Sequence, residues 1–100
     1  MADSKERRSL QESWATTTRH LSAARQVLSD AGLDRSDSAT VAVQEFQDSL
    51  AHNELELALD ALEAAAVGEE PPSDFWEHLL RAARTMGLVG RAARIEQELR

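Results

Sequence analysis

A seam of small and apolar residues recurs at alternating steps of four and three along the first third of the chain. Its members are Leu10, Trp14, Thr17, Leu21, Ala24, Leu28 and Ala31. Such heptad spacing places all of them on one side of an α-helix. Gly32 predicts a left-handed stop, with Leu33 making a hydrophobic contact behind it. We therefore expect one long helix over residues 4–31, with Asp3 and Glu6 as a capping box at its start.

The middle of the chain predicts two further helices. The first begins near residues 34–37, ends at His52, and places Ala39, Val43, Phe46 and Leu50 on one face. Asn53 and Glu56 then predict a capping box for the next helix. The apolar stripe of that helix comprises Leu55, Leu59, Leu62 and Ala66, widened by Leu57, Ala61, Ala64 and Ala65. This helix is expected to be central and contacted on two sides.

The C-terminal third predicts two more helices after a loop at Pro71 and Pro72, which cannot donate backbone hydrogen bonds. Ser73 or Asp74 is expected to cap the fourth helix, and Gly87 to end it. Its apolar face consists of Phe75, Trp76, Leu79, Leu80, Ala83 and Met86. A short final helix spans residues 88–99.

Length and composition point to one all-α domain over residues 1–100. A chain of 100 residues is too short to divide into two domains with adequate cores. Its seventeen alanines favour helix. We expect a compact bundle of four to five helices with a long N-terminal helix. Trp14 and Trp76 lie on apolar stripes, which predicts that both belong to the core.

Negative charge is concentrated in the middle of the chain. Residues 36–80 contain no Lys or Arg, although the net charge of the whole chain is only −7. The eleven acids in this stretch are Asp37, Glu45, Asp48, Glu54, Glu56, Asp60, Glu63, Glu69, Glu70, Asp74 and Glu77. A surface of this kind attracts a cationic partner and disfavours nucleic-acid phosphates and anionic lipid. A solvated face that only aids solubility is the alternative.

The residues that usually carry catalysis do not form a recognisable constellation. His20, His52 and His78 lie in separate predicted elements without metal-ligand spacing. The glycines are isolated, so no phosphate-binding loop is expected. There is no cysteine and no apolar run long enough to span a membrane. We expect a non-enzymatic protein without metal or cofactor, and the N-terminus lacks a signal-peptide pattern, which makes the cytoplasm the default location.

Several segments resemble small bacterial immunity proteins of the MafI type. They are residues 46–62, which read FQDSLAHNELELALDAL, followed by Phe75-Trp76-Glu77 and by residues 84–88, RTMGL. In that family a helix ends in a turn such as His-Gly-Glu, and a later helix ends in Met-Gly-Leu. The present chain has Asn53 where glycine is usual. The resemblance covers the central and C-terminal helices and implies a non-enzymatic antidote that binds a co-encoded toxin, often a nuclease.

Charge and resemblance together predict a binding site for a basic toxin domain. Each candidate residue carries a carboxylate and belongs to the second or third predicted helix. The candidates are Glu45, Asp48, Glu54, Glu56, Asp60 and Glu63. We expect these carboxylates to stay unpaired within the fold, since no basic residue lies at helical spacing from them. The alternative is an adaptor or dimerisation domain acting through the seam of the first helix, which leaves a homodimer open.

Overall fold

A computed structural model describes the backbone of residues 4–100 and the side chains of residues 12–100. Within these residues the chain is helical and contains no strand. The helices are α1 (Ser4–Asp30), α2 (Asp37–Ala51), α3 (Leu55–Ala65), α4 (Ser73–Thr85) and α5 (Val89–Gln97). The all-α class and the long N-terminal helix are confirmed. The capping box predicted at Asp3 and Glu6, and the position of the Leu10 side chain, lie outside the described residues.

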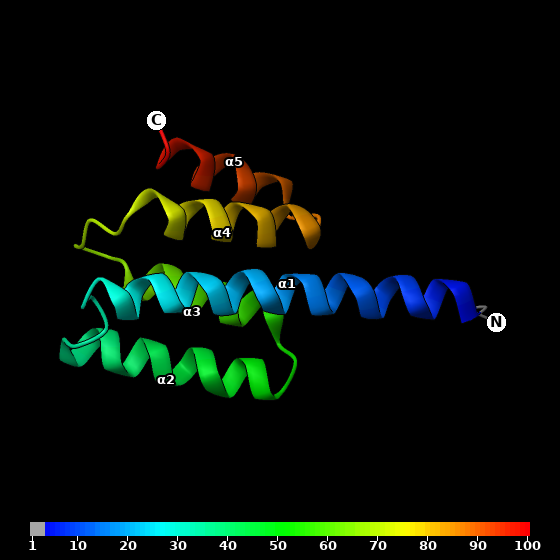
Figure 1. Cartoon of the computed structure of the whole chain (residues 1–100), viewed down its shortest axis with the longest axis horizontal. Coiled ribbons are helices and arrows are strands. Elements are labelled where there is room, and N and C mark those ends of the chain that lie inside the picture. Colours follow the sequence, from blue (N-terminus) through cyan, green and yellow to red (C-terminus); the bar gives the residue numbers. More distant parts are fainter. Residues whose placement is uncertain (1–3) are drawn as a thin grey trace.

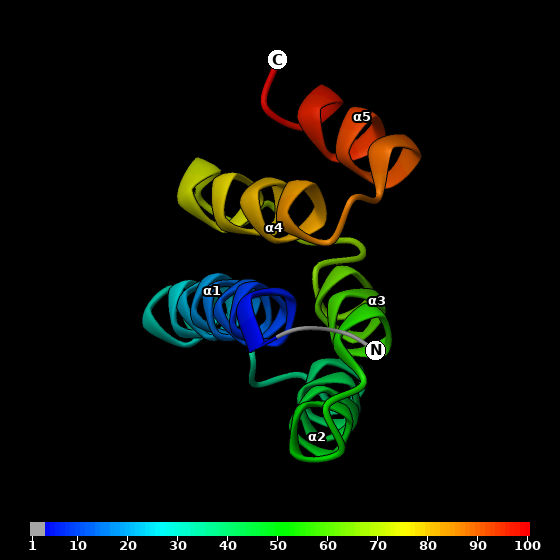
Figure 2. The same ribbon diagram turned by 90° about the vertical axis from the view of Figure 1, so that its right-hand side faces the viewer.

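The helices pack as two pairs with a fifth helix added on one side. α1 packs mainly against α4, and α2 mainly against α3. α5 lies on α4, and α1 also contacts α3, which joins the two pairs (Figures 1 and 2). α3 therefore contacts more than one neighbour, as its wide apolar arc predicted. The N-terminal part of α1 extends past the ends of the other helices (Figure 1).

The core is built from the predicted apolar stripes. Leu21 and Leu28 of α1 are completely buried, together with Leu59, Phe75 and Leu79. The seam of α1 is therefore confirmed from Thr17 to Leu28, and it faces the inside of this chain. Burying a Leu or Phe side chain stabilises the fold by about 1.5–3 kcal/mol. These contacts hold the four longer helices in one unit.

Left-handed glycines end α1 and α4. Gly32 follows α1 with φ of 72°, and the N–H of Leu33 donates to the carbonyl of Leu28 at 2.9 Å. Gly87 ends α4 in the same way, with φ of 75°. This backbone pattern satisfies carbonyls at the helix end and favours glycine, which lacks a Cβ. The predicted stops at both glycines are confirmed.

Asn53 ends α2 and does not cap α3, which corrects the predicted capping box. Its φ is 58°, and the N–H of Glu54 donates to the carbonyl of Ser49 at 2.8 Å. α3 begins after Glu54 without a side-chain cap. Asparagine is one of the few residues other than glycine that adopts the left-handed conformation readily. In this conformation Asn53 ends α2.

The starts of α2 and α4 differ from each other. Ser36 caps α2, because its Oγ accepts a hydrogen bond from the N–H of Ala39 at 3.1 Å. The residue at the cap position of α4 is Pro72, and no side chain caps that helix. The prediction that Ser73 or Asp74 caps α4 is therefore wrong. Ser73 is the first residue of α4, since Pro72 has the extended backbone that a cap position requires.

Two large residues assigned to the apolar stripes, Trp14 and Leu57, are instead exposed, as are the alanines Ala31 and Ala64. Trp14 of α1 retains 46% of its accessible surface. Leu57 retains 50%, since it lies on the outer edge of the α3 arc. Trp76, by contrast, is partly buried and packs against the core. The prediction of a core position is wrong for Trp14 and Leu57.

Candidate functional site

The six predicted acids lie on the hairpin formed by α2 and α3. Glu45 and Asp48 belong to α2, and Glu54 is the residue before α3. The remaining three, Glu56, Asp60 and Glu63, follow one another at helical spacing along α3. All are exposed apart from Glu63, which is half-buried. Because α2 and α3 pack against each other, the six carboxylates belong to one unit of the fold.

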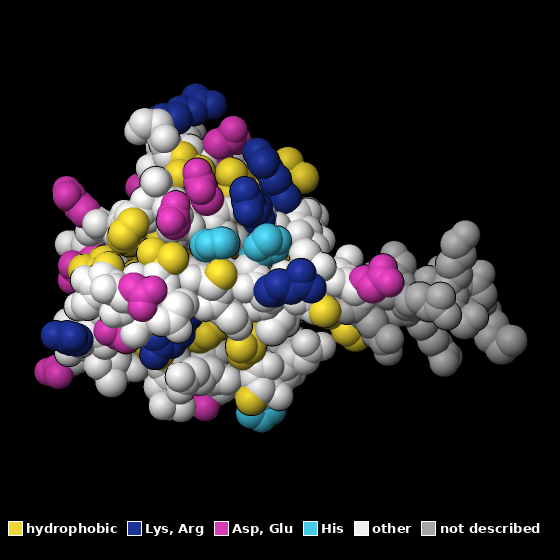
Figure 3. Space-filling view, in the orientation of Figure 1, with side chains coloured by type: hydrophobic (Ala, Val, Ile, Leu, Met, Phe, Trp, Pro, Cys, Tyr) yellow, Lys and Arg dark blue, Asp and Glu magenta, His cyan; other side chains and the backbone are white. Residues whose placement is uncertain are grey.

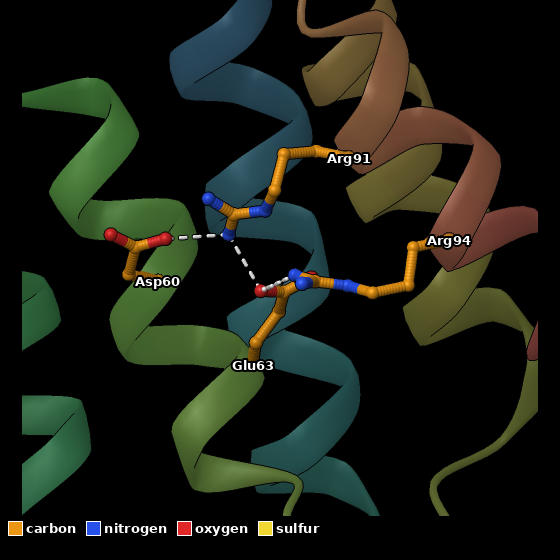
Figure 4. Close-up of polar contacts among 4 residues, drawn as sticks. All are labelled: Asp60, Glu63, Arg91 and Arg94. Atoms are coloured by element: carbon orange, nitrogen blue, oxygen red, sulfur yellow. Dashed lines mark hydrogen bonds and ion pairs between the residues drawn. The ribbon is translucent and has the colours of Figure 1, made fainter.

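Two of these acids are held by arginines from α5 (Figure 4). Nη2 of Arg91 lies 2.5 Å from Oδ1 of Asp60 and 2.6 Å from Oε2 of Glu63. Nη2 of Arg94 donates to the same oxygen of Glu63 at 2.9 Å. The side chains of Glu63 and Arg91 are only 19% and 21% exposed, whereas that of Arg94 is 63% exposed. Arg91 is therefore the central member of this cluster.

The environment of Arg91 favours its charged form. Partial burial works against the charge, but the hydrogen bonds and fields of Asp60 and Glu63 outweigh it and raise the pKa of the guanidinium. The expectation that all six carboxylates stay unpaired is thus wrong for Asp60 and Glu63. The rule that pairs residues three or four apart could not find these partners, since they come from another helix.

The other four acids have no such partner. No ion pair found among residues 12–100 includes Glu45, Asp48, Glu54 or Glu56. Asp48 accepts a hydrogen bond from the side chain of Gln44 at 3.1 Å. Glu54 and Glu56 lie at the start of α3, where a negative charge also complements the helix dipole. Four of the six candidate acids, together with Asp37 at the start of α2, therefore form no ion pair among residues 12–100.

A shallow depression lies between α2 and α3. Its α2 side is formed by Glu45 and Ser49, and its α3 side by Leu57, Asp60, Ala61 and Ala64. The exposed Leu57 shares this depression with the carboxylates of Glu45 and Asp60, so apolar surface lies beside negative charge. Sequence reasoning assigned Leu57 to the core and so missed it. Its exposure could have been predicted from its position at the edge of the apolar arc of α3, because the other apolar residues of that helix already form a wide enough face to pack in the core.

The histidines have other surroundings. His20 of α1 and His78 of α4 stack with their ring centroids 6.2 Å apart. Burial, His78, Arg81 and Arg19 together lower the pKa of His20. Figure 3 shows histidines beside basic side chains on the face formed by α1 and α4. His52 follows α2, and its Nδ1 lies 2.7 Å from the carbonyl oxygen of Asp48.

No cluster suited to a metal ion is found in the described part of the chain. Among these residues no three His, Asp or Glu side chains come together in a way that could hold one. No helix of the described segment has the length and apolar character that crossing a membrane requires.

Comparison with models of protein families, with curated proteins and with solved structures gives no match to this chain.

Proposed function

We propose that this protein is a non-enzymatic immunity protein that binds and neutralises a cognate basic toxin domain, in the manner of the MafI-type antidotes that its sequence resembles. The observation that carries the proposal is the set of four exposed acids, Glu45, Asp48, Glu54 and Glu56, which have no ion-pair partner among residues 12–100. Because the toxin's target would be cytoplasmic, the antidote would act in the cytoplasm.

The arrangement of charge supports recognition of a cationic groove. In the cluster of Asp60, Glu63, Arg91 and Arg94, two negative and two positive groups cancel. The four remaining candidate acids, with Asp37 at the start of α2, carry the net negative charge of the hairpin. A nuclease presents cationic residues to hold phosphates, and carboxylates can occupy the same positions. The exposed Leu57, which lines the same depression as Glu45, adds apolar surface beside these acids.

The adaptor alternative has less support because the seam of α1 is largely used inside the chain. Leu21, Ala24 and Leu28 have no accessible surface, and Thr17 has almost none. A partner could reach these residues only after α1 separated from α4. Docking through the seam is therefore restricted to the part of α1 before Thr17.

Charge reversal on α2 tests the proposal with little disturbance of the fold. The variant carries Glu45→Arg and Asp48→Arg, which avoids the ion pairs of α3 and the helix start at Glu54. The matched control carries Glu69→Arg and Glu70→Arg, because both are exposed and lie in the loop outside the hairpin. Each variant changes the net charge by the same amount. The probe is the C-terminal domain of the protein encoded immediately upstream, expressed in a heterologous host.

Two readouts decide the outcome. Co-expression of the wild-type chain should relieve growth arrest by that domain, and titration calorimetry should show a complex. The Glu45/Asp48 reversal should weaken binding by about 100-fold, equivalent to about 2.7 kcal/mol, while the Glu69/Glu70 control stays near wild type. Equal affinity of the two variants for the toxin domain would contradict a role of Glu45 and Asp48 in binding. Absence of protection by the wild-type chain would contradict the antidote function.

A further inference from the structure

Four basic side chains come together on the face formed by α1 and α4. His20 of α1 and His78 of α4 stack across the contact between these helices. The guanidinium groups of Arg19 and Arg81 lie close enough for their charges to act on His20. Both histidines are half-buried, and both arginines are exposed. These four residues, which we call the basic cluster, thus join a histidine pair to two guanidinium groups that solvent reaches.

The arginines of the basic cluster have no acidic partner in the described part of the chain. No ion pair found among residues 12–100 includes Arg19 or Arg81. Other arginines do pair with carboxylates, and they are Arg25, Arg84, Arg91 and Arg94. This face therefore carries positive charge that no ion pair within residues 12–100 neutralises, although the net charge of the chain is −7.

The histidine pair adds hydrogen-bond donors to this charge. Nδ1 of His78 is buried and has no hydrogen-bond partner among the described residues. A hydrogen on Nδ1 would find no acceptor, so the neutral ring carries its hydrogen on Nε2 and donates from there. An oxyanion requires N–H donors and positive charge together. A metal ion on the histidines, by contrast, would be repelled by the two guanidinium groups.

We propose that the basic cluster binds a phosphate-type dianion, either free phosphate or the phosphate group of an ester. Arginine offers several N–H groups in a planar fork that matches phosphate oxygens, and such charge-assisted hydrogen bonds are about twice as strong as neutral ones. Each helix contributes one arginine and one histidine, so the donors come from both sides of the contact between α1 and α4. A bound anion would bridge the two helices.

This site is separate from the acidic surface of the α2–α3 hairpin. The basic cluster belongs to α1 and α4, which pack on each other. The toxin-binding test changes Glu45 and Asp48 of α2, and neither is part of the cluster. Failure of one test therefore leaves the other inference intact.

Nuclear magnetic resonance of the three histidine rings tests the site. Titration with inorganic phosphate should shift the ring signals of His20 and His78. The signals of His52 should stay unchanged, because His52 follows α2, which packs mainly against α3. Phenyl phosphate serves as the ester. Tighter binding of phenyl phosphate would assign the anion to a larger ligand, and equal affinity would assign it to free phosphate.

Two pairs of substitutions separate a built site from general attraction. Arg19→Gln with Arg81→Gln should lower the affinity for phosphate at least tenfold. The control is Arg35→Gln with Arg100→Gln, because both arginines are exposed, form no ion pair among residues 12–100 and change the net charge equally. Glu77→Gln should raise the affinity, since Glu77 lies one turn before Arg81 on α4. Circular dichroism checks that the variants keep their helices.

Three results would overturn the proposal. The first is a wild-type chain whose His20 and His78 signals do not move at about 10 mM phosphate or phenyl phosphate. The second is an equal loss of affinity in the two pairs of arginine variants, which would show attraction to net charge alone. The third is a shift of both histidines by Zn²⁺ and not by phosphate, which would assign the pair to a metal.

Discussion

Oε2 of Glu63 accepts a hydrogen bond of 2.6 Å from Nη2 of Arg91, although 28 positions separate the two residues in the chain. This contact connects α3 to α5, and Asp60 extends it along α3. α5 has only nine residues and is too short to be stable by itself. The pair therefore supplements the apolar packing of Ala92 and Ile95 in holding α5 on the bundle.

Replacing Arg91 should destabilise the protein. Arg91→Met removes the bonds to Asp60 and Glu63, and it leaves the half-buried Glu63 with Arg94 alone. We expect a loss of about 1–3 kcal/mol in the free energy of unfolding, measured by urea denaturation at pH 7. Arg84→Met is the control, because Arg84 and Glu96 lie 3.9 Å apart and both are largely exposed. It should change stability by less than about 0.5 kcal/mol, and an equal loss in both variants would contradict the special role of Arg91.

Adding a Cβ should have opposite effects at two glycines of the C-terminal region. Gly87 has φ of 75°, and a Cβ there would meet no neighbouring atom. The cost of Gly87→Ala is therefore conformational, about 1–2 kcal/mol. Gly90 lies inside α5 with an ordinary φ, so Gly90→Ala should stabilise by up to about 0.5–1 kcal/mol. Thermal unfolding of the two variants measures both signs, and a stabilised Gly87→Ala would contradict the left-handed turn.

Two leucines of α3 that are two positions apart should respond very differently to truncation. Leu59 is completely buried, so Leu59→Ala should cost about 2–5 kcal/mol through lost burial and the cavity that remains. Leu57 is half exposed, and Leu57→Ala should cost about 0.5 kcal/mol. Chemical denaturation compares them. Similar losses would show that Leu57 belongs to the core and is not available to a partner.

The stacked histidines predict a dependence of stability on pH. Because the pKa of His20 is lowered in the fold, the unfolded chain binds the proton more readily. The contribution of His20 is therefore complete above the usual value of 6.5 and is lost as the pH falls below it. The causes are burial and the positive groups that face it, His78 and Arg81 from α4 and Arg19 from α1.

The measurement is the urea midpoint at pH 7 and pH 5. Carboxylates titrate over the same range, so the relevant quantity is the difference between wild type and His20→Gln. We expect the wild-type midpoint to fall more between the two pH values than the midpoint of the variant. Parallel changes in both proteins would show that His20 does not contribute.

Helix positions were predictable because their signals are local. Gly32 and Gly87 end helices where the sequence indicated, since the left-handed conformation depends on a few neighbouring residues. Asn53 was misread because an asparagine three residues before a glutamate fits a capping box as well as a left-handed helix end. The hydrogen bond from Glu54 to the carbonyl of Ser49 decides between them. The sequence around Asn53 fits both local patterns, and it does not show which of the two structures forms.

The candidate site was less predictable because it depends on which helices become neighbours. Asp60 and Glu63 were expected to stay unpaired, but their arginine partners lie on α5, about 30 positions later. Trp14 occupies its expected seam position. Its exposure depends on how far α3 and α4 extend along α1. The spacing of apolar residues within α1 carries no information about the other helices. Five of the six proposed binding residues are exposed, and four of the six have no ion-pair partner among residues 12–100.

The packing of α1 against α4 has a consequence for synthesis of the protein. The N-terminus leaves the ribosome first, yet α4 lies in the last third of the chain. Leu21 and Leu28 are thus expected to stay open to chaperones and proteases while α2 and α3, adjacent in sequence, already associate. Limited proteolysis of ribosome-bound chains halted near residue 66 should cut α1, whereas chains that extend past α4 should resist. α1 is synthesised first, but it would be among the last helices to pack into the fold.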